Sequence, residues 1–234
     1  MTTAALSTEG RGEHVPNHET LIEVYPRLYH MAHVGAWPSI ERFGLLSTTA
    51  LLDLFEIGGE RREQLELSKR SKSEEISHPK HGRALLRDQI PLNEKKLAKA
   101  LQDGLAPRDW YRLLNRKAYF WGPESRLKIL REAREYTDHR QTIIVIDTGQ
   151  LVARHGERIS LCHMNSGATQ PMAFPRGLST FLSIDSYPLA DRLRKYGAKG
   201  AVAEVTVDYS VPDLREFVIE AYEIGGSEKR RDLR

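Results

Sequence analysis

The sequence predicts a single α+β domain. Short apolar runs with many β-branched residues alternate with amphipathic, helix-like stretches along the early part of the chain. In the later part the apolar runs follow one another closely, which favours an α+β arrangement over a doubly wound parallel sheet. With 234 residues, 40% of them hydrophobic, the chain is long enough to bury a large core. We expect a disordered lead-in at residues 1–16, one domain at 17–225 and a charged, frayed tail at 226–234.

Helix signals mark the amphipathic stretches. Asn17 is a candidate N-cap for the first helix, and Pro107 suits the first position of a later one. The pair Gly58-Gly59 stops the apolar stretch TTALLDLFEI. Helices are predicted at residues 17–25, 36–43, 48–57, 61–67, 93–102, 107–114, 124–136, 150–154 and 189–196.

Apolar runs too short for helices predict the strands. The run TIIVID at 142–147 is the clearest, because it is short and rich in β-branched residues. The polar, basic segment 68–86 contains Pro79 and Gly82 and is predicted to be a loop. Strands are predicted at residues 28–33, 117–121, 142–147, 158–163, 181–184, 201–207 and 217–222.

Composition limits the class of protein. Cys162 is the single cysteine, so an internal disulfide is impossible, a structural zinc site is not expected and a reducing cytoplasm is the expected compartment. No apolar run reaches the roughly 18 residues that a membrane span needs, and the N-terminal residues lack the pattern of a secretory signal. The net charge of +3 is mild, but basic residues gather at 69–87 and 108–117. Such segments favour phosphate binding or, equally, a solvated helix face or loop.

Two residues stand out as candidates for chemistry. His30 lies in a short apolar strand that is followed by a helix, an arrangement that often places an imidazole at the lip of a cleft. Glu204 lies in the run AVAEVTV, where burial of a carboxylate is costly unless it is paired or functional. The alternative is that Glu204 shares a solvated face with Thr206. His163 and Asn165 either line a cleft or form a simple turn.

Known nucleotide and hydrolase motifs are absent from the sequence. It lacks G-x-G-x-x-G, the P-loop, H-E-x-x-H and G-x-S-x-G. A nucleotide cofactor would therefore not be held by a Rossmann turn.

The surroundings of His30 and Glu204 resemble a known family. The stretch LYHMAHVGAWPSIERFGLLS at 28–47 is similar to the opening of the ADP-ribosyltransferases, particularly the DarT-like DNA ADP-ribosyltransferases, which have a Tyr-His strand followed by x-I-x-x-x-G-L-x-S. AVAEVTVDYSVP resembles the family's late strand with its catalytic glutamate, including Ser210 and Pro212 after it. The stretches AYFWGPES and TIIVIDTGQLV resemble the family's middle strands.

The resemblance implies an ADP-ribosyltransferase-like split β-sheet with flanking helices and a central cleft for NAD. Glu204 would be the catalytic residue, holding the nicotinamide ribose and stabilising the positive charge as nicotinamide leaves. The NAD-binding residues would be His30 at the adenosine-side ribose, Ser47 or Thr48 through a hydroxyl, Tyr119 and Phe120 around the nicotinamide, and Arg87, or failing that Arg83, at the pyrophosphate.

The function implied by the resemblance is transfer of ADP-ribose from NAD, used as a substrate, to a macromolecule. A nucleic-acid base is the expected acceptor, with DNA favoured over RNA, and a toxin or defence role would bring a cognate antitoxin as partner. One alternative keeps the fold but changes the reaction to protein-directed ADP-ribosylation or RNA 2′-phosphotransfer. The other is a catalytically silent module that binds nucleic acid or a partner protein.

Overall fold

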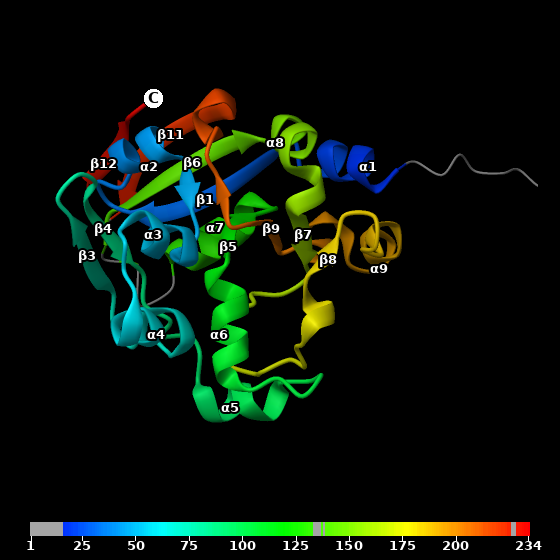
Figure 1. Ribbon diagram of the computed structural model, residues 1–234. Helices are drawn as coiled ribbons and strands as arrows, with labels where there is room; N and C mark the ends of the chain where they lie inside the picture. Colours follow the sequence, from blue (N-terminus) through cyan, green and yellow to red (C-terminus); the bar gives the residue numbers. More distant parts are fainter. Residues whose placement is uncertain (1–15, 133–136, 138, 226–227) are drawn as a thin grey trace, which may run out of the picture.

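The computed structural model describes residues 16–132, 137, 139–225 and 228–234. The expected lead-in at 1–16 lies outside the described residues except for Pro16. The architecture is α+β, as predicted, with helices packed around a large antiparallel sheet (Figure 1). None of the helices in the described ranges is both long and apolar enough to cross a membrane.

Eight strands of the described chain form the main sheet, and every neighbouring pair is antiparallel. Their order in space is β12 (Glu228–Asp232), β11 (Val218–Gly225), β6 (Gln141–Asp147), β1 (Arg27–His33), β5 (Lys117–Trp121), β9 (Glu204–Asp208), β7 (Ile159–Cys162) and β8 (Leu182–Ser183). Two small sheets accompany it, β2 (Leu45–Leu46) with β10 (Ser210–Val211), and β3 (Glu74–His78) with β4 (Gly82–Leu86).

The helices surround this sheet. Figure 1 shows α4, α5 and α6 on one side of it, and α1, α8 and α9 towards the end that carries β7 and β8. Their bounds are α1 (Asn17–Val24), α2 (Trp37–Phe43), α3 (Thr48–Leu54), α4 (Gly59–Leu67), α5 (Glu94–Ala100), α6 (Pro107–Asn115), α7 (Glu124–Arg131), α8 (Thr148–His155) and α9 (Leu189–Ala201). Short 3₁₀ turns are η1 (Gly156–Arg158), η2 (Leu178–Thr180) and η3 (Leu214–Phe217).

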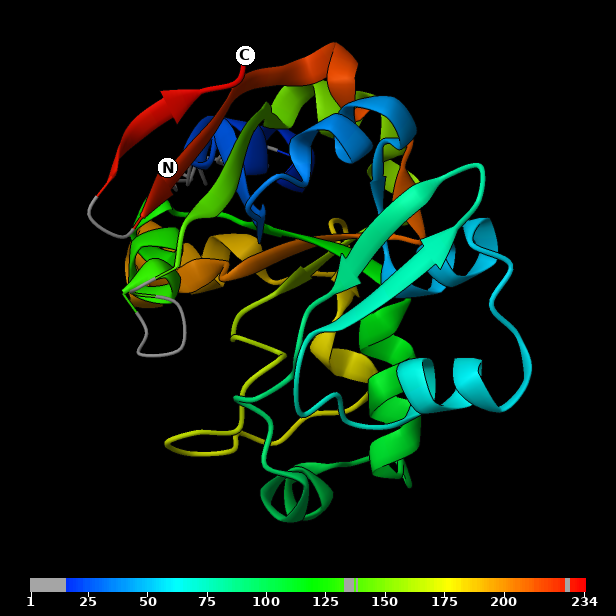
Figure 2. The ribbon, with the colours of Figure 1, turned by 90° about the vertical axis from the view of Figure 1, so that its left-hand side faces the viewer.

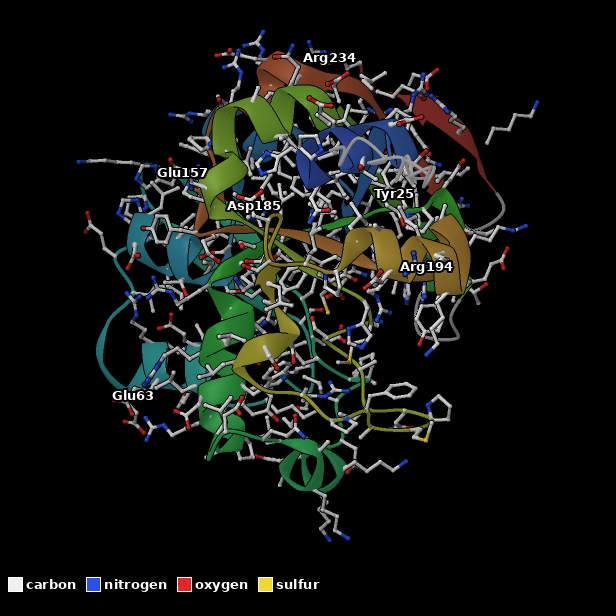
Figure 3. All side chains as sticks on the ribbon, turned by 90° about the vertical axis from the view of Figure 1, so that its right-hand side faces the viewer. Tyr25, Glu63, Glu157, Asp185, Arg194 and Arg234 are labelled. Carbon is white, nitrogen blue, oxygen red and sulfur yellow. The ribbon has the colours of Figure 1, made fainter. Side chains whose placement is uncertain are left out.

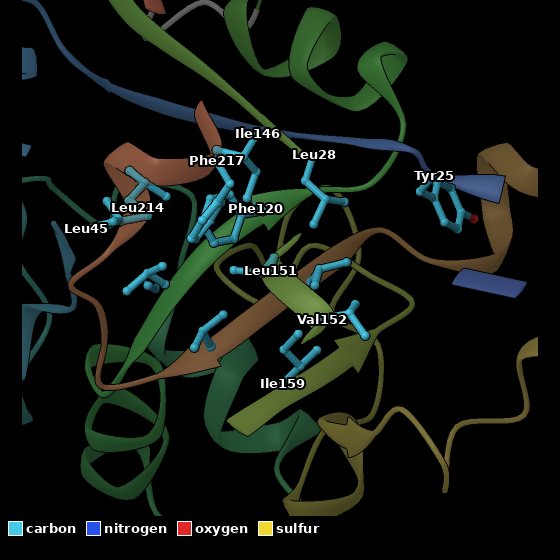
Figure 4. Close-up of a cluster of buried hydrophobic side chains, with 14 of the residues drawn as sticks. Tyr25, Leu28, Leu45, Phe120, Ile146, Leu151, Val152, Ile159, Leu214 and Phe217 are labelled. Atoms are coloured by element: carbon cyan, nitrogen blue, oxygen red, sulfur yellow. The ribbon is translucent and has the colours of Figure 1, made fainter. Parts of the chain in front are cut away.

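The largest core cluster lies under one face of the sheet (Figure 4). Leu28, Phe120 and Ile146 come from three neighbouring strands, and Leu151 of α8 and Phe217 of η3 pack against them. These side chains are buried, and each buried side chain of this size contributes about 1.5–3 kcal/mol to stability. The core therefore fixes β1, β5 and β6 in place beneath the cleft described below.

A hydrogen bond joins α1 to α9 beside the main sheet. The Tyr25 hydroxyl at the end of α1 donates a 2.6 Å hydrogen bond to the Ala198 carbonyl in α9 (Figure 3). Charged side chains such as Glu63, Glu157 and Arg194 lie exposed at the periphery in the same view. Tyr25 thus joins the first helix to the helix that precedes β9.

The main sheet divides between β1 and β5. β1 pairs with β6 along its whole length, from Arg27↔Asp147 to His33↔Gln141. By contrast β1 pairs with β5 at one position, Tyr29↔Trp121. The sheet therefore has two halves, β12-β11-β6-β1 and β5-β9-β7-β8, which separate beyond this pair.

The turn after α2 closes against the segment after β9. Gly44 has φ 78°, and a Cβ there would lie 2.4 Å from both Pro212 Cα and Val211 O, so only glycine fits. The next residues form β2, where Leu45 pairs with Val211. The Gly-Leu-Leu-Ser motif and the Ser-Val-Pro motif, which are distant in sequence, are thus direct neighbours.

The predicted loop at 68–86 is wrong, because it contains a β-hairpin. β3 and β4 pair from Glu74↔Leu86 to His78↔Gly82, and Gly82 turns the chain with φ 77°. Ile76 and Leu86 pack on apolar side chains of α3 and α4. Ile76 and Leu86 are the buried positions of the hairpin, with Ala84 partly buried beside them, so the polar residues around them hid the strand pattern.

Two other boundaries differ from the prediction. The expected strand at 201–207 begins only at Glu204, because α9 continues to Ala201. The charged tail is not frayed throughout, since Glu228–Asp232 form the edge strand β12 on β11. Arg230 supports this edge by lying 3.8 Å from the centroid of the Tyr222 ring and 2.7 Å from Glu220 Oε2.

Candidate active site

A cleft of about 700 Å³ opens where β1 and β5 separate. This volume is within the range of about 300–1,000 Å³ that is usual for small-molecule sites. Its walls come from β1, residues 39–48, β5, the turn at 165–167 and the β3–β4 hairpin. Figure 2 shows this hairpin in front of the sheet. Among the residues that line it are His30, Ser47, Arg83, Arg87, Tyr119, Asn165, Ser166 and Glu204.

Glu204 is buried at the base of this cleft, with 3% of its surface exposed. The Ser166 amide donates a 3.1 Å hydrogen bond to Oε1, whereas Oε2 has no hydrogen-bond partner in the described part of the chain. Burial raises the pKa of Glu204 to about 7. At neutral pH the site therefore holds a carboxyl group that can both carry charge and exchange a proton.

The position of Glu204 follows from the pairing of β9. Glu204 lies opposite Trp121 of β5 and Cys162 of β7, while Val205 and Val207 point into the core. The solvated-face alternative is wrong, because Thr206 is also fully buried. Its hydroxyl donates to the Ser160 carbonyl at 3.2 Å.

His30 enters the cleft from the other half of the sheet. Its Nδ1 lies 2.8 Å from the Tyr119 carbonyl oxygen. Because a carbonyl only accepts, Nδ1 carries the proton and Nε2 of the neutral ring is left as an acceptor. Burial lowers the pKa of His30 to about 4, and the nearby charge of Arg87 acts in the same direction. His30 is therefore a neutral hydrogen-bonding group at physiological pH.

Tyr119 and Phe120 occupy opposite faces of β5. Tyr119 lines the cleft, its hydroxyl donates to the Leu114 carbonyl at 3.2 Å, and burial raises its pKa well above the usual value. Phe120 points away from the cleft into the core (Figure 4). The expectation that Phe120 packs around a nicotinamide is thus wrong, since successive strand residues alternate between faces.

The other residues expected to bind NAD also lie along the cleft. Arg87 lines it at the end of β4, with its Nη1 3.1 Å from the Met31 carbonyl oxygen. Arg83 lines it from an exposed position and lies 3.7 Å from Glu75. Ser47 caps α3, where its Oγ accepts from the Ala50 amide at 3.1 Å.

The turn at 165–167 contributes two residues to the site: Asn165, which the sequence analysis considered, and Ser166, which it did not. Asn165 lines the cleft, as one of its two interpretations predicted, and its side-chain oxygen accepts from the Gly167 amide at 3.1 Å. Ser166 was not singled out, although its amide is the group that holds Glu204. A backbone donor leaves no residue-type signal. Only the polar Asn-Ser-Gly sequence after a strand pointed to a turn here.

The described ranges contain no group of three or more His, Cys, Asp and Glu side chains suited to a metal ion.

Comparison with known proteins identifies a family. The family model that matches is that of a family of unknown function, DUF7002, and the match covers residues 26–218. The chain belongs to the DUF7002 family. No curated protein matches the chain significantly. The DUF7002 match runs from the residue before β1 to the first residue of β11, so it includes both His30 and Glu204.

Proposed function

We propose that this DUF7002 protein is an NAD-dependent ADP-ribosyltransferase with an ADP-ribosyltransferase-like fold. One observation carries the proposal. A neutral histidine near the start of the family match and a buried glutamate near its end line the same cleft. The division of the sheet between β1 and β5, with a cleft where its halves separate, supports the proposal.

The proposed pose of NAD follows from the donors and acceptors of the cleft. Nε2 of His30 accepts a hydrogen bond from a hydroxyl of the adenosine-side ribose. Arg87 meets the pyrophosphate with a planar cationic group, and Arg83 adds charge at the rim. Tyr119 provides an aromatic wall for the nicotinamide, and Ser47 adds a hydroxyl.

Glu204 is the catalytic residue in this proposal. The bond between nicotinamide nitrogen and ribose C1′ breaks, C1′ becomes oxocarbenium-like, and the acceptor nucleophile forms the new bond to C1′. A carboxylate aimed at the ribose stabilises the developing positive charge. Its free Oε2 can also orient the acceptor and take its proton, for which a pKa near 7 is well suited.

A nucleic-acid base, in DNA before RNA, is the proposed acceptor. Arg83 and Arg87 bring positive charge to the cleft. The segment that follows Ser166 also exposes three large apolar side chains, Met172, Phe174 and Leu178, and an unpaired base can stack on the Phe174 ring. A base inside a duplex cannot reach Glu204, so single-stranded or flipped substrate is required.

The test is incubation of the purified protein with adenine-labelled NAD and single-stranded DNA, RNA or a protein pool, together with a nicotinamide-release assay. The proposal predicts label on nucleic acid and nicotinamide release with wild type, and neither with Glu204→Gln. Label on protein alone would contradict a nucleic-acid acceptor and favour protein-directed ADP-ribosylation. Transfer of the 2′-phosphate of an RNA to the ADP-ribose part of NAD would favour the phosphotransferase alternative.

Failure to release nicotinamide with every acceptor would contradict the proposal and favour a silent binding module. A toxin role, with an antitoxin as partner, is tested separately by induced expression. Growth arrest by wild type that Glu204→Gln abolishes is the expected result.

A further inference from the structure

Arg176 is buried in a position where its charge is costly. Only 1% of its surface is exposed, and its guanidinium donates to backbone carbonyls and not to a carboxylate in the described chain. Its guanidinium lies over Trp110 of α6, 5.7 Å from the ring centroid. A buried cation without a direct counter-ion destabilises a fold unless other interactions compensate for its desolvation.

The hydrogen bonds of the Arg176 guanidinium in the described chain go to backbone carbonyls. Nη1 donates to the Ser166 carbonyl at 3.0 Å and Nε donates to the Phe174 carbonyl at 3.1 Å. Its own amide donates to Ala100 O at 2.9 Å, and its carbonyl accepts from Gln102 N at 2.9 Å. Arg176 thus ties the segment that contains Ser166 to the chain at the end of α5.

Ser166 is the residue that connects Arg176 to Glu204. The Ser166 carbonyl is held by Arg176, and the Ser166 amide is the donor to Glu204 Oε1. The Ser166 and Cys162 side chains also lower the pKa of the Glu204 carboxyl as hydrogen-bonding neighbours, so Ser166 acts on the carboxylate through both its backbone and its side chain. The orientation of the Glu204 carboxylate therefore depends on the position of Ser166, which Arg176 fixes through its carbonyl.

The positive charge of Arg176 also acts on the Glu204 carboxyl. The titratable groups that face Glu204 are Tyr119 of β5, Cys162 of β7 and Arg176. Burial raises the pKa of the tyrosine hydroxyl and of the thiol, so both are neutral. Arg176 is then the cation among them, and it favours the charged form of Glu204.

We propose that Arg176 is a positioning residue that orients Glu204 through Ser166. The catalytic consequence rests on the proposed function, whereas the structural relation between Arg176 and Glu204 does not.

The test compares Arg176→Gln and Arg176→Lys with a matched control, Arg192→Gln. Arg192 also donates to backbone carbonyls, to Ala201 O at 2.9 Å and Gly200 O at 3.4 Å, and lies over the Tyr196 ring, but it does not line the cleft. The readout is the titration of the Glu204 carboxyl by infrared difference spectroscopy against the Glu204→Gln form of each variant, without NAD. We expect the Glu204 pKa to rise by about one unit in Arg176→Gln and to stay near wild type in Arg176→Lys and Arg192→Gln.

In the enzyme assay, Arg176→Gln should lower kcat for nicotinamide release about 10- to 100-fold and move the acid limb of its pH profile upward, with KM for NAD changed less than about 3-fold. An unchanged Glu204 titration in folded Arg176→Gln would overturn the inference. If Arg176→Gln does not fold, Arg176→Lys is the deciding variant. A rise of the Glu204 pKa in Arg176→Lys, which keeps the positive charge, would also overturn the inference. If wild type releases no nicotinamide, the proposed function fails, yet the titration still tests Arg176.

Discussion

The two halves of the divided sheet each bring one titratable group to the cleft, the half-buried His30 and the buried Glu204, and burial shifts their pKa values in opposite directions. It lowers the pKa of His30 to about 4 and raises the pKa of Glu204 to about 7, in each case favouring the neutral form. His30 is therefore uncharged throughout the physiological range. Glu204 is divided between two protonation states there. The half that carries His30 is suited to binding, and the half that carries Glu204 is suited to chemistry.

The largest expected effect is on turnover by Glu204→Gln. Glutamine keeps the size and the acceptor for the Ser166 amide but cannot carry negative charge, so kcat for nicotinamide release should fall about 10³-fold. The NAD dissociation constant, measured by calorimetry, should change less than about 3-fold.

A matched control is Glu223→Gln in the other half. Glu223 is equally buried but lies 3.2 Å from Arg140 and does not line the cleft. It should keep wild-type kcat. Equal losses of kcat in Glu204→Gln and Glu223→Gln would contradict the assignment of the chemistry to the half that carries Glu204.

The second prediction concerns the pH dependence of stability at Glu204. Its pKa is higher in the folded chain than the value of 4.5 in the unfolded chain, so the folded state binds the proton more tightly. The resulting stabilisation is complete below about pH 4.5 and is lost as the pH rises through 7. Relative to Glu204→Gln, wild type should lose about 3 kcal/mol of unfolding free energy across this window, measured by urea denaturation. Parallel pH profiles would contradict it.

The third prediction has the opposite sign and concerns His30. Its folded pKa of about 4 is below the unfolded value of 6.5, so the stabilisation is complete above 6.5 and is lost as the pH falls towards 4. Wild type should lose about 2 kcal/mol relative to His30→Asn between about pH 6.5 and about pH 5. The measurement is the same urea series. A loss on raising the pH instead would show that the ring is charged in the folded state.

The smallest expected effect is on NAD affinity. His30→Asn keeps a donor near the Tyr119 carbonyl but lacks Nε2, so NAD should bind about 10-fold more weakly, as expected for one lost hydrogen bond. kcat should change little. His18→Asn, on α1 beside Asp185, is the control and should bind NAD like wild type. A large loss of kcat without a loss of affinity would reverse the roles of the two halves.

The sequence predicted elements best where burial was continuous. The β-branched run of β6 and the helix that starts at Pro107 were found because apolar spacing and a start signal agreed. The β3–β4 hairpin was missed because only Ile76 and Leu86 are deeply buried in it. Two-stranded, mostly polar pairing leaves little periodicity to detect.

At the site, His30 and Glu204 were singled out from the sequence pattern, and the family resemblance added Ser47, Arg87 and Tyr119. These five residues line the cavity. Phe120 was assigned to the wrong face because an aromatic pair in a strand does not reveal which member points inward. Ser166 and Arg176 could not be predicted, because their roles depend on backbone groups and on contacts between distant segments.

The central claim is that one bound NAD is contacted from both halves of the sheet. The most direct measurement is a crystal structure of Glu204→Gln with NAD, since the variant should bind without turning over. We predict a ribose hydroxyl on the adenosine side within hydrogen-bond distance of His30 Nε2, and the nicotinamide ribose beside the side chain at position 204. NAD bound elsewhere, or touching one of these residues without the other, would contradict the account.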